Sequence, residues 1–132
     1  MPRPQSASLA AEDEAALVAR ARRNDPAALA ELMRRNNRRL YRAAWGILRD
    51  EQEAEDAVQD CYLKAFAALA KFRGEAALTT WLTRIVINEA QAAAVRLALV
   101  ELYLTRGMGS VQICQELDRR GVPPPRGAAW AT

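Results

Sequence analysis

The sequence predicts an all-α protein, with a compact helical bundle followed by a smaller helical appendage. Three observations support this prediction. The chain has 132 residues, of which 51% are hydrophobic, so it can bury a sizeable core. Alanine, a strong helix former, is abundant, whereas β-branched residues are few outside short runs. Apolar residues recur at three- and four-residue spacing in successive segments, as in amphipathic helices.

The first two helices are predicted from their start and stop signals. We expect residues 1–11 to form a flexible tail, because they contain Pro, Ser and Ala without periodicity. A first helix follows over about 12–23. Asp25 then caps a second helix that carries Pro26 at its first position. An apolar stripe that includes Trp45 runs along this second helix as far as Leu48.

The third helix is predicted to begin at Asp50, with Glu53 three residues later as in a capping box. Glu53, Asp56 and Asp60 form an acidic stripe along this helix. Nearly opposite this stripe, the helix presents an apolar face made of Ala54, Ala57, Val58, Cys61, Tyr62, Ala65, Phe66 and Leu69.

A loop over 71–80 separates the third helix from the fourth. Thr79 and Thr80 form a capping pair for a helix that starts near Trp81. These elements complete a predicted domain over 12–90. The appendage, residues 91–132, is predicted to contain a helix over 91–106 and a short helix capped by Ser110. The short helix turns Val111, Ile113, Cys114 and Leu117 inward and ends at Gly121.

The composition argues against an enzyme. The chain has no His and only two Cys, and no Gly-rich phosphate loop is present, so we expect no metal and no cofactor. Cys61 and Cys114 both lie in apolar patterns, as buried free thiols do in a reducing cytoplasm. The longest apolar stretch, 92–104, is interrupted by charges and too short for a bilayer, so we expect a cytoplasmic protein without a membrane segment.

Charge is distributed unevenly, although the net charge is only +3. A basic run in the second helix precedes the acidic stripe of the third. The basic run contains Arg34, Arg35, Arg38, Arg39 and Arg42. A mildly basic chain suits a nucleic-acid partner, and the acidic stripe suits a basic protein partner. Two solvated helix faces are the alternative interpretation.

Two segments resemble a known family. DEQEAEDAVQDCYLKAF spans residues 50–66, and KFRGEAALTTWLTRIVINEA spans residues 71–90. Together with the preceding helices, they resemble region 2 of the extracytoplasmic-function (ECF) sigma factors, a branch of the sigma-70 family. The combination of AEDAVQD, FRG, WLTRI and NEA at this spacing is specific, although each motif alone is weak.

The resemblance implies an RNA polymerase subunit that recognises and melts the promoter −10 element. In this family the acidic helix docks on a coiled coil of the largest subunit of core RNA polymerase. That role falls on Glu53, Asp56, Gln59 and Asp60, with a solvated face as the alternative. The resemblance also implies that promoter DNA is a partner, including its single-stranded non-template strand. It suggests an anti-sigma protein as a further partner.

The loop and the fourth helix supply the predicted DNA-binding surface. A loop over 72–80 can form a pocket for a flipped base. Phosphates are expected at Lys71, Arg73 and Arg84, and a base edge at Asn88. Phe72 and Trp81 either stack on bases or pack in the core. Gly74, Thr79 and Thr80 complete the predicted surface.

The C-terminal part departs from the sigma pattern, because NEA is not followed by an Arg-rich helix end. Residues 95–130 are instead similar to the start of the helix-turn-helix-like DNA-binding domain of large serine recombinases, without the catalytic domain. Arg119, Arg120 and Arg126 either contact phosphates or belong to a solvated helix. We therefore expect a sigma factor-like subunit that lacks the domain reading the −35 element. A recombinase-related DNA-binding fragment and an inactive fusion remnant are the alternatives.

Overall fold

The computed structural model describes residues 13–74 and 76–122, which form helices and connecting turns and contain no strand. The all-α fold class is therefore confirmed. The predicted tail over 1–11 and the residues from 123 onward lie outside the described part. The elements are α2 (Glu14–Ala21), α3 (Pro26–Leu48), α4 (Glu51–Ala67), the 3₁₀ turn η1 (Leu69–Lys71), α5 (Leu78–Val100), the π turn η2 (Glu101–Thr105) and α6 (Ser110–Arg119).

Aspartates cap the first three of these helices. Asp13 Oδ1 accepts a hydrogen bond from the Ala16 backbone N–H at 2.8 Å, and Asp25 Oδ1 accepts one from the Ala27 N–H at 3.0 Å. Asp50 Oδ1 accepts one from the Glu53 N–H at 2.9 Å. Each bond satisfies a backbone donor that the first turn of a helix leaves free. The predicted caps at Asp25 and Asp50 are confirmed.

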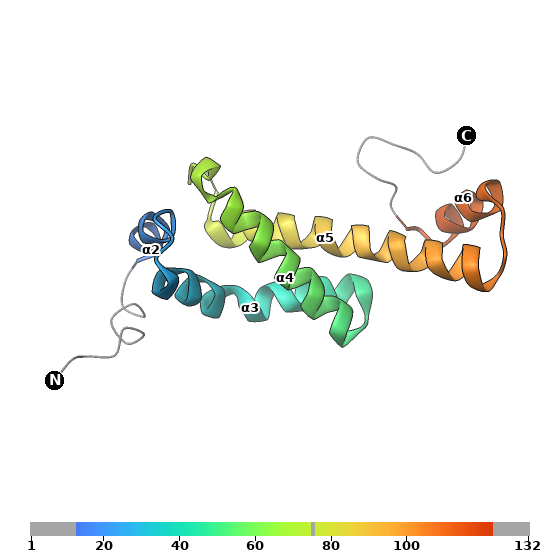
Figure 1. Ribbon diagram of the computed structural model, residues 1–132, viewed down its shortest axis with the longest axis horizontal. Helices are drawn as coiled ribbons and strands as arrows, with labels where there is room; N and C mark the ends of the chain where they lie inside the picture. Colours follow the sequence, from blue (N-terminus) through green and yellow to red (C-terminus); the bar gives the residue numbers. More distant parts are fainter. Residues whose placement is uncertain (1–12, 75, 123–132) are drawn as a thin grey trace.

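Helices α3, α4 and the first half of α5 form the bundle, with α2 at one end (Figure 1). Lys64 Nζ lies 2.5 Å from Glu89 Oε1, and Arg96 Nη2 lies 3.3 Å from Glu53 Oε2, so α4 and α5 run antiparallel. The core between them is apolar and contains the fully buried side chains of Leu32, Leu40, Leu78, Leu82 and Val86. Helix α2 adds Leu17 and Val18 to the same core.

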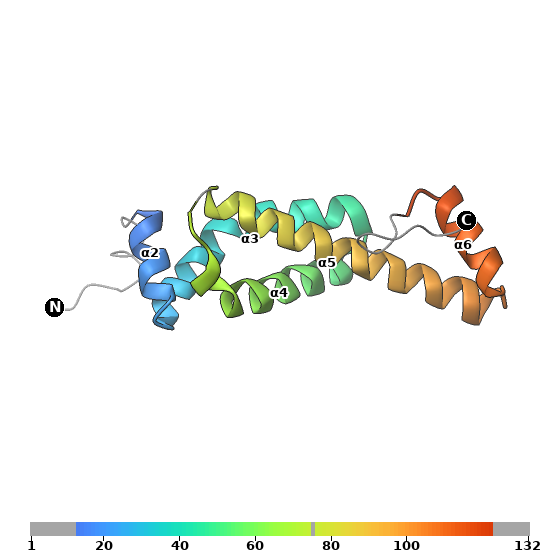
Figure 2. The same cartoon turned by 90° about the horizontal axis from the view of Figure 1, so that it is seen from above.

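Helix α5 differs from the prediction at both ends. It begins at Leu78 rather than near Trp81, and Ala77 precedes it without a side-chain cap. The predicted capping pair is wrong, because Thr79 lies inside the first turn and its hydroxyl donates to Asn36 Oδ1 on α3 at 2.7 Å. The helix is continuous through position 90 and extends beyond the bundle to α6 (Figures 1 and 2).

A second, smaller core joins the end of α5 to α6. Ala98, Leu102, Ile113 and Leu117 are buried there, with Met108 and Val122 against them. The predicted inward positions of Ile113 and Leu117 are confirmed, but Val111 is 65% exposed. The predicted cap at Ser110 is wrong, because Gly109 precedes the helix and donates its N–H to Gln112 Oε1 at 3.0 Å. Gly121 follows the helix with a φ of +74°, as expected of a terminating glycine.

Two further side chains lie differently from the prediction. Trp45 was expected in the apolar stripe of α3, but it is 39% exposed, and the Arg49 guanidinium lies 4.7 Å from its ring centroid. A cation over the ring face compensates for part of that exposure. Cys61 is buried as expected, whereas Cys114 is only half-buried.

Candidate functional site

The outer face of α4 presents acidic and polar side chains to solvent. Asp56, Gln59 and Asp60 are exposed, and their three- and four-residue spacing puts them on one side of the helix. Leu63, one turn beyond Asp60, is 69% exposed. The opposite side of α4 packs in the core, so this face is held rigidly. Sequence patterns missed Leu63, because it is separate from the apolar stripe of the helix.

Glu53 lies on the same side of α4, one turn before Asp56, but it is less exposed than the other three predicted residues. Its side chain is 25% exposed and forms an ion pair with Arg96 of α5 at 3.3 Å. Glu53 therefore contributes to the contact between α4 and α5. Asp56 accepts a hydrogen bond from Gln52 Nε2 at 3.0 Å within the same helix, which leaves its carboxylate on the surface.

The loop before α5 is anchored by an aromatic pair. Phe72 is 9% exposed, and its ring centroid lies 5.0 Å from that of Trp81 with a tilt of 37° between the planes. This geometry is favourable for aromatic packing. Phe72 is thus part of the core, which favours core packing among the two predicted roles of its ring. Trp81 is half-buried.

A hollow of about 200 Å³ opens beside this aromatic pair. It brings together six of the nine residues predicted to bind DNA. The hollow is lined by Lys71, Phe72, Arg73, Gly74, Ala76, Trp81 and Arg84. Three of these residues are cationic and none is acidic, so the hollow is a positively charged site.

The other three predicted DNA-binding residues lie outside the hollow. Thr79 faces α3, where it binds Asn36, and its hydroxyl is therefore engaged. Thr80 is exposed in the first turn of α5. Asn88 is exposed one turn after Arg84 on the same helix, so these two side chains share one face.

Two side chains of the α2 region hold the same loop, and sequence patterns did not identify them. Arg22 Nε donates to the Leu69 carbonyl at 3.2 Å, and its Nη2 donates to the Phe72 carbonyl. Glu14 Oε2 accepts from the Leu78 N–H at 3.3 Å. These partners are 47 to 64 residues apart in the sequence, so local spacing gives no signal for them.

The basic run of α3 is partly engaged within its own helix. Glu31 is 3% exposed and binds Arg34 Nη2 at 2.7 Å and Arg35 Nε at 2.8 Å. The hydrogen bonds from Arg34 and then Arg35 hold the pKa of Glu31 below its usual value. Arg38, Arg39 and Arg42 are exposed.

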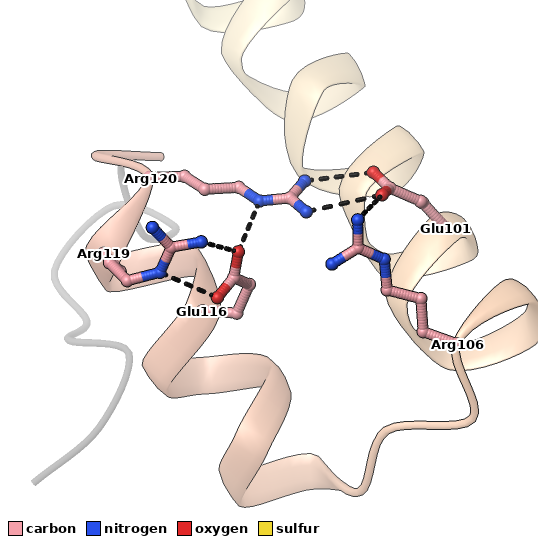
Figure 3. Close-up of polar contacts among 5 residues, drawn as sticks. All are labelled: Glu101, Arg106, Glu116, Arg119 and Arg120. Atoms are coloured by element: carbon pink, nitrogen blue, oxygen red, sulfur yellow. Dashed lines mark hydrogen bonds and ion pairs between the residues drawn. The ribbon is translucent and has the colours of Figure 1, made fainter.

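The arginines of α6 are bound to carboxylates (Figure 3). Arg120 Nη1 lies 3.0 Å from Glu101 Oε2, and its Nε lies 2.9 Å from Glu116 Oε1. Arg119 forms a second ion pair with Glu116. Hydrogen bonds from Arg119 and Arg120 lower the pKa of Glu116 to about 2. Arg120 thus joins Glu116 of α6 to Glu101 of η2, whereas the pair of Arg119 with Glu116 lies within α6. Both arginines are engaged in contacts within the fold.

Within 13–74 and 76–122, no cluster of His, Cys, Asp or Glu is arranged to hold a metal ion. No helix in this part of the chain is long and apolar enough to cross a membrane. The described part thus presents an acidic face on α4 and a cationic hollow at the start of α5.

Comparison with known families assigns the chain to one of them. A family model described as Sigma-70 region 2 matches residues 32–98, which is about half of the chain. The chain belongs to the sigma-70 region 2 family. The match begins within α3, contains all of α4 and continues along α5 past position 90.

The chain is also similar to several curated sigma factors. It is 37% identical over 83 residues to the RNA polymerase sigma-H factor of Pseudomonas aeruginosa, covering 63% of this chain and 43% of that protein. It is 40% identical over 75 residues to the ECF RNA polymerase sigma factor SigM of Mycobacterium tuberculosis, covering 57% and 38%. The chain thus spans less than half the length of these relatives. No solved structure matches it.

Proposed function

We propose that this chain binds core RNA polymerase and promoter DNA as a sigma factor-like initiation subunit, and that it works by binding rather than by catalysis. The observation that carries the proposal is the pairing of two surfaces on one rigid bundle. One is the acidic face of α4, and the other is the cationic hollow between the loop and α5. The relatives named as RNA polymerase sigma factors support the same assignment.

The acidic face suits a basic protein surface such as a polymerase coiled coil. Asp56, Gln59 and Asp60 offer exposed polar groups, and Leu63 adds an exposed apolar side chain beside them. Interfaces commonly combine an apolar contact with a polar rim. Opposite charges chiefly steer association and fix the register of docking. We propose these four residues as the polymerase-binding face, together with Glu53 one turn before Asp56.

The cationic hollow suits a single DNA strand. Lys71, Arg73 and Arg84 can neutralise phosphates, which accounts for most of the affinity in such contacts. The half-buried Trp81 borders the hollow, where it can meet a base that has left the helical stack. We propose this hollow as the place where the promoter −10 element is held open, with Asn88 reading a base edge.

Polymerase binding by a charge-reversed variant tests the proposal. We expect Asp56→Arg combined with Asp60→Arg to weaken binding to core RNA polymerase at least about tenfold, because both charges face the partner. Asp118→Arg, an exposed reversal on α6, is the control and should bind as the native chain does. Circular dichroism checks that helicity is unchanged. Native-like binding by the double variant contradicts the proposed face.

Three further predictions extend this function. We propose the cytoplasm as the place of action, since polymerase and promoters are found there, and an anti-sigma protein as an additional partner. For residues 91–132, similarity to the recombinase DNA-binding domain stays a prediction. The engagement of Arg119 and Arg120 with Glu116 argues for a packing role of those two side chains.

A further inference from the structure

The loop that borders the cationic hollow has few apolar contacts of its own. Its described residues are 72–74 and 76–77, called here the recognition loop. Phe72 anchors one end in the core, but Arg73, Gly74 and Ala77 are exposed. Gly74 adopts a φ of +76°, which costs glycine little because it has no Cβ. The same lack of a side chain leaves the backbone at this position with considerable conformational freedom. Something other than core burial must therefore fix the shape of this loop.

Helix α2 supplies contacts at both ends of the recognition loop. At the first end, Arg22 donates to the carbonyl of Leu69, the first residue of η1, and to the carbonyl of Phe72, which follows η1. Both bonds have a cationic donor, and such bonds are stronger than those between neutral groups. At the second end, Glu14 accepts from the backbone N–H of Leu78, the first residue of α5.

The Glu14 contact satisfies a backbone group that no neighbouring side chain can bind. Ala77 precedes α5 and has no side chain able to cap it, so the first N–H groups of α5 need an acceptor from elsewhere. Glu14 is that acceptor, and its negative charge matches the positive end of the helix dipole. A second hollow, of about 400 Å³, lies between α2 and the loop and includes both Glu14 and Arg22 in its lining.

We propose that Arg22 and Glu14 are positioning residues, which hold the recognition loop in the shape that captures an unpaired DNA strand. The inference rests on the proposed function. Holding a loop in its bound shape lowers the entropy cost of binding, so it increases affinity and selectivity without a new contact to the ligand. Neither side chain needs to touch DNA.

The test compares variants of the full chain in complex with core RNA polymerase. The probe is a single-stranded DNA pool of random sequence, from which strands bound by the native complex are enriched. Selectivity is then the ratio of affinities for the enriched strands and for the starting pool. We expect Arg22→Met to reduce this ratio about tenfold, while polymerase affinity and the thermal midpoint stay near native values. Arg23→Met is the matched control, because Arg23 is exposed and its side chain forms no hydrogen bond or ion pair in the described part.

A second pair of variants keeps the test decisive should Arg22→Met fail to fold. Glu14→Ala removes the acceptor and should lower selectivity, whereas Glu14→Gln retains an oxygen at that position and should restore most of it. Amide hydrogen exchange in the recognition loop should accelerate in Arg22→Met and in Glu14→Ala, but not in Glu14→Gln or Arg23→Met. Native selectivity in both of these variants overturns the positioning role. If the native complex enriches no strand, the proposed function itself fails and the positioning role fails with it.

Discussion

Two glycines differ in backbone conformation, so replacement by alanine should have opposite effects on stability at the two positions. Gly74 has a φ of +76°, whereas Gly46 lies inside α3 with helical geometry. A Cβ added at either position meets nothing within 4 Å, so side-chain clashes do not decide the effect of alanine. The backbone conformation at each position decides it instead.

We expect Gly74→Ala to destabilise the fold by about 1–2 kcal/mol, the cost of a left-handed conformation for a residue with a Cβ. Gly46→Ala should stabilise it by roughly 0.5–1 kcal/mol, because alanine loses less conformational entropy in a helix. Urea unfolding of both variants measures the two changes. Effects of the same sign would contradict this assignment of their backbone roles.

The two cysteines should differ in reactivity. Burial, followed by the nearby Glu89 carboxylate, raises the pKa of the Cys61 thiol to about 12, and its S–H donates to the Leu82 carbonyl at 3.4 Å. Only the thiolate attacks a disulfide reagent, so Cys61 should stay unmodified in the folded protein. Cys114 is half-buried and should react first. Thiol titration with and without denaturant checks this order, and Cys114→Ser should remove the fast phase.

At the scale of helices, the sequence predicted what depends on near neighbours. Asp25 and Asp50 bond backbone groups two and three residues away, so their roles are visible in local spacing. Thr79 looks like a cap by the same criteria, but its partner Asn36 lies 43 residues earlier. Likewise, the sequence around Arg22 does not predict its hydrogen bonds to the carbonyls of Leu69 and Phe72. The acidic face and the cationic residues were predictable, whereas the burial of Phe72 depends on tertiary packing.

One buried amide adds a polar contact to the apolar packing between α3 and α5. Asn36 is 3% exposed, and its Nδ2 donates to the Leu32 carbonyl at 2.7 Å while its Oδ1 accepts from Thr79. We expect Asn36→Ala to cost about 1–3 kcal/mol, because the Thr79 hydroxyl then loses its acceptor. Asn88→Ala, on the exposed face of α5, should stay within about 0.5 kcal/mol. Chemical denaturation measures both, and equal values would exclude a structural role for the buried amide.

The contact of α6 with α5 should persist in mild acid. Hydrogen bonds from Arg119 and Arg120 lower the pKa of Glu116 to about 2, below the usual value near 4.3. A lowered pKa in the folded state means that the stabilisation is present above the unfolded value and is lost as the pH falls through the folded one. We expect α6 to remain packed at pH 4 and to loosen as the pH approaches 2. An NMR titration follows this change, and Glu116→Gln should weaken the packing already at pH 7.

At the scale of the whole molecule, two cores of unequal size share one helix. Among the residues that the structure describes, eighteen buried ones form the cluster of the bundle, and four form the cluster beneath α6. Regions with few buried apolar contacts open at lower free energy than the main core. The amides of α6 should therefore exchange with solvent well before those of α3 and α4. Native-state hydrogen exchange by mass spectrometry measures this, and uniform protection across both parts would show that they unfold as one unit.

The continuity of α5 has a mechanical consequence. A helix rises about 1.5 Å per residue and hardly changes length, so α5 sets a spacing of roughly 35 Å between the recognition loop and the base of α6. It also acts as a lever. The part beyond position 90 extends about 15 Å to Val100, so tilting the bundle by about 10° on a partner would swing that end by roughly 3 Å. A molecule in contact with α6 would therefore be displaced when the orientation of the bundle on its partner changes, although neither core rearranges.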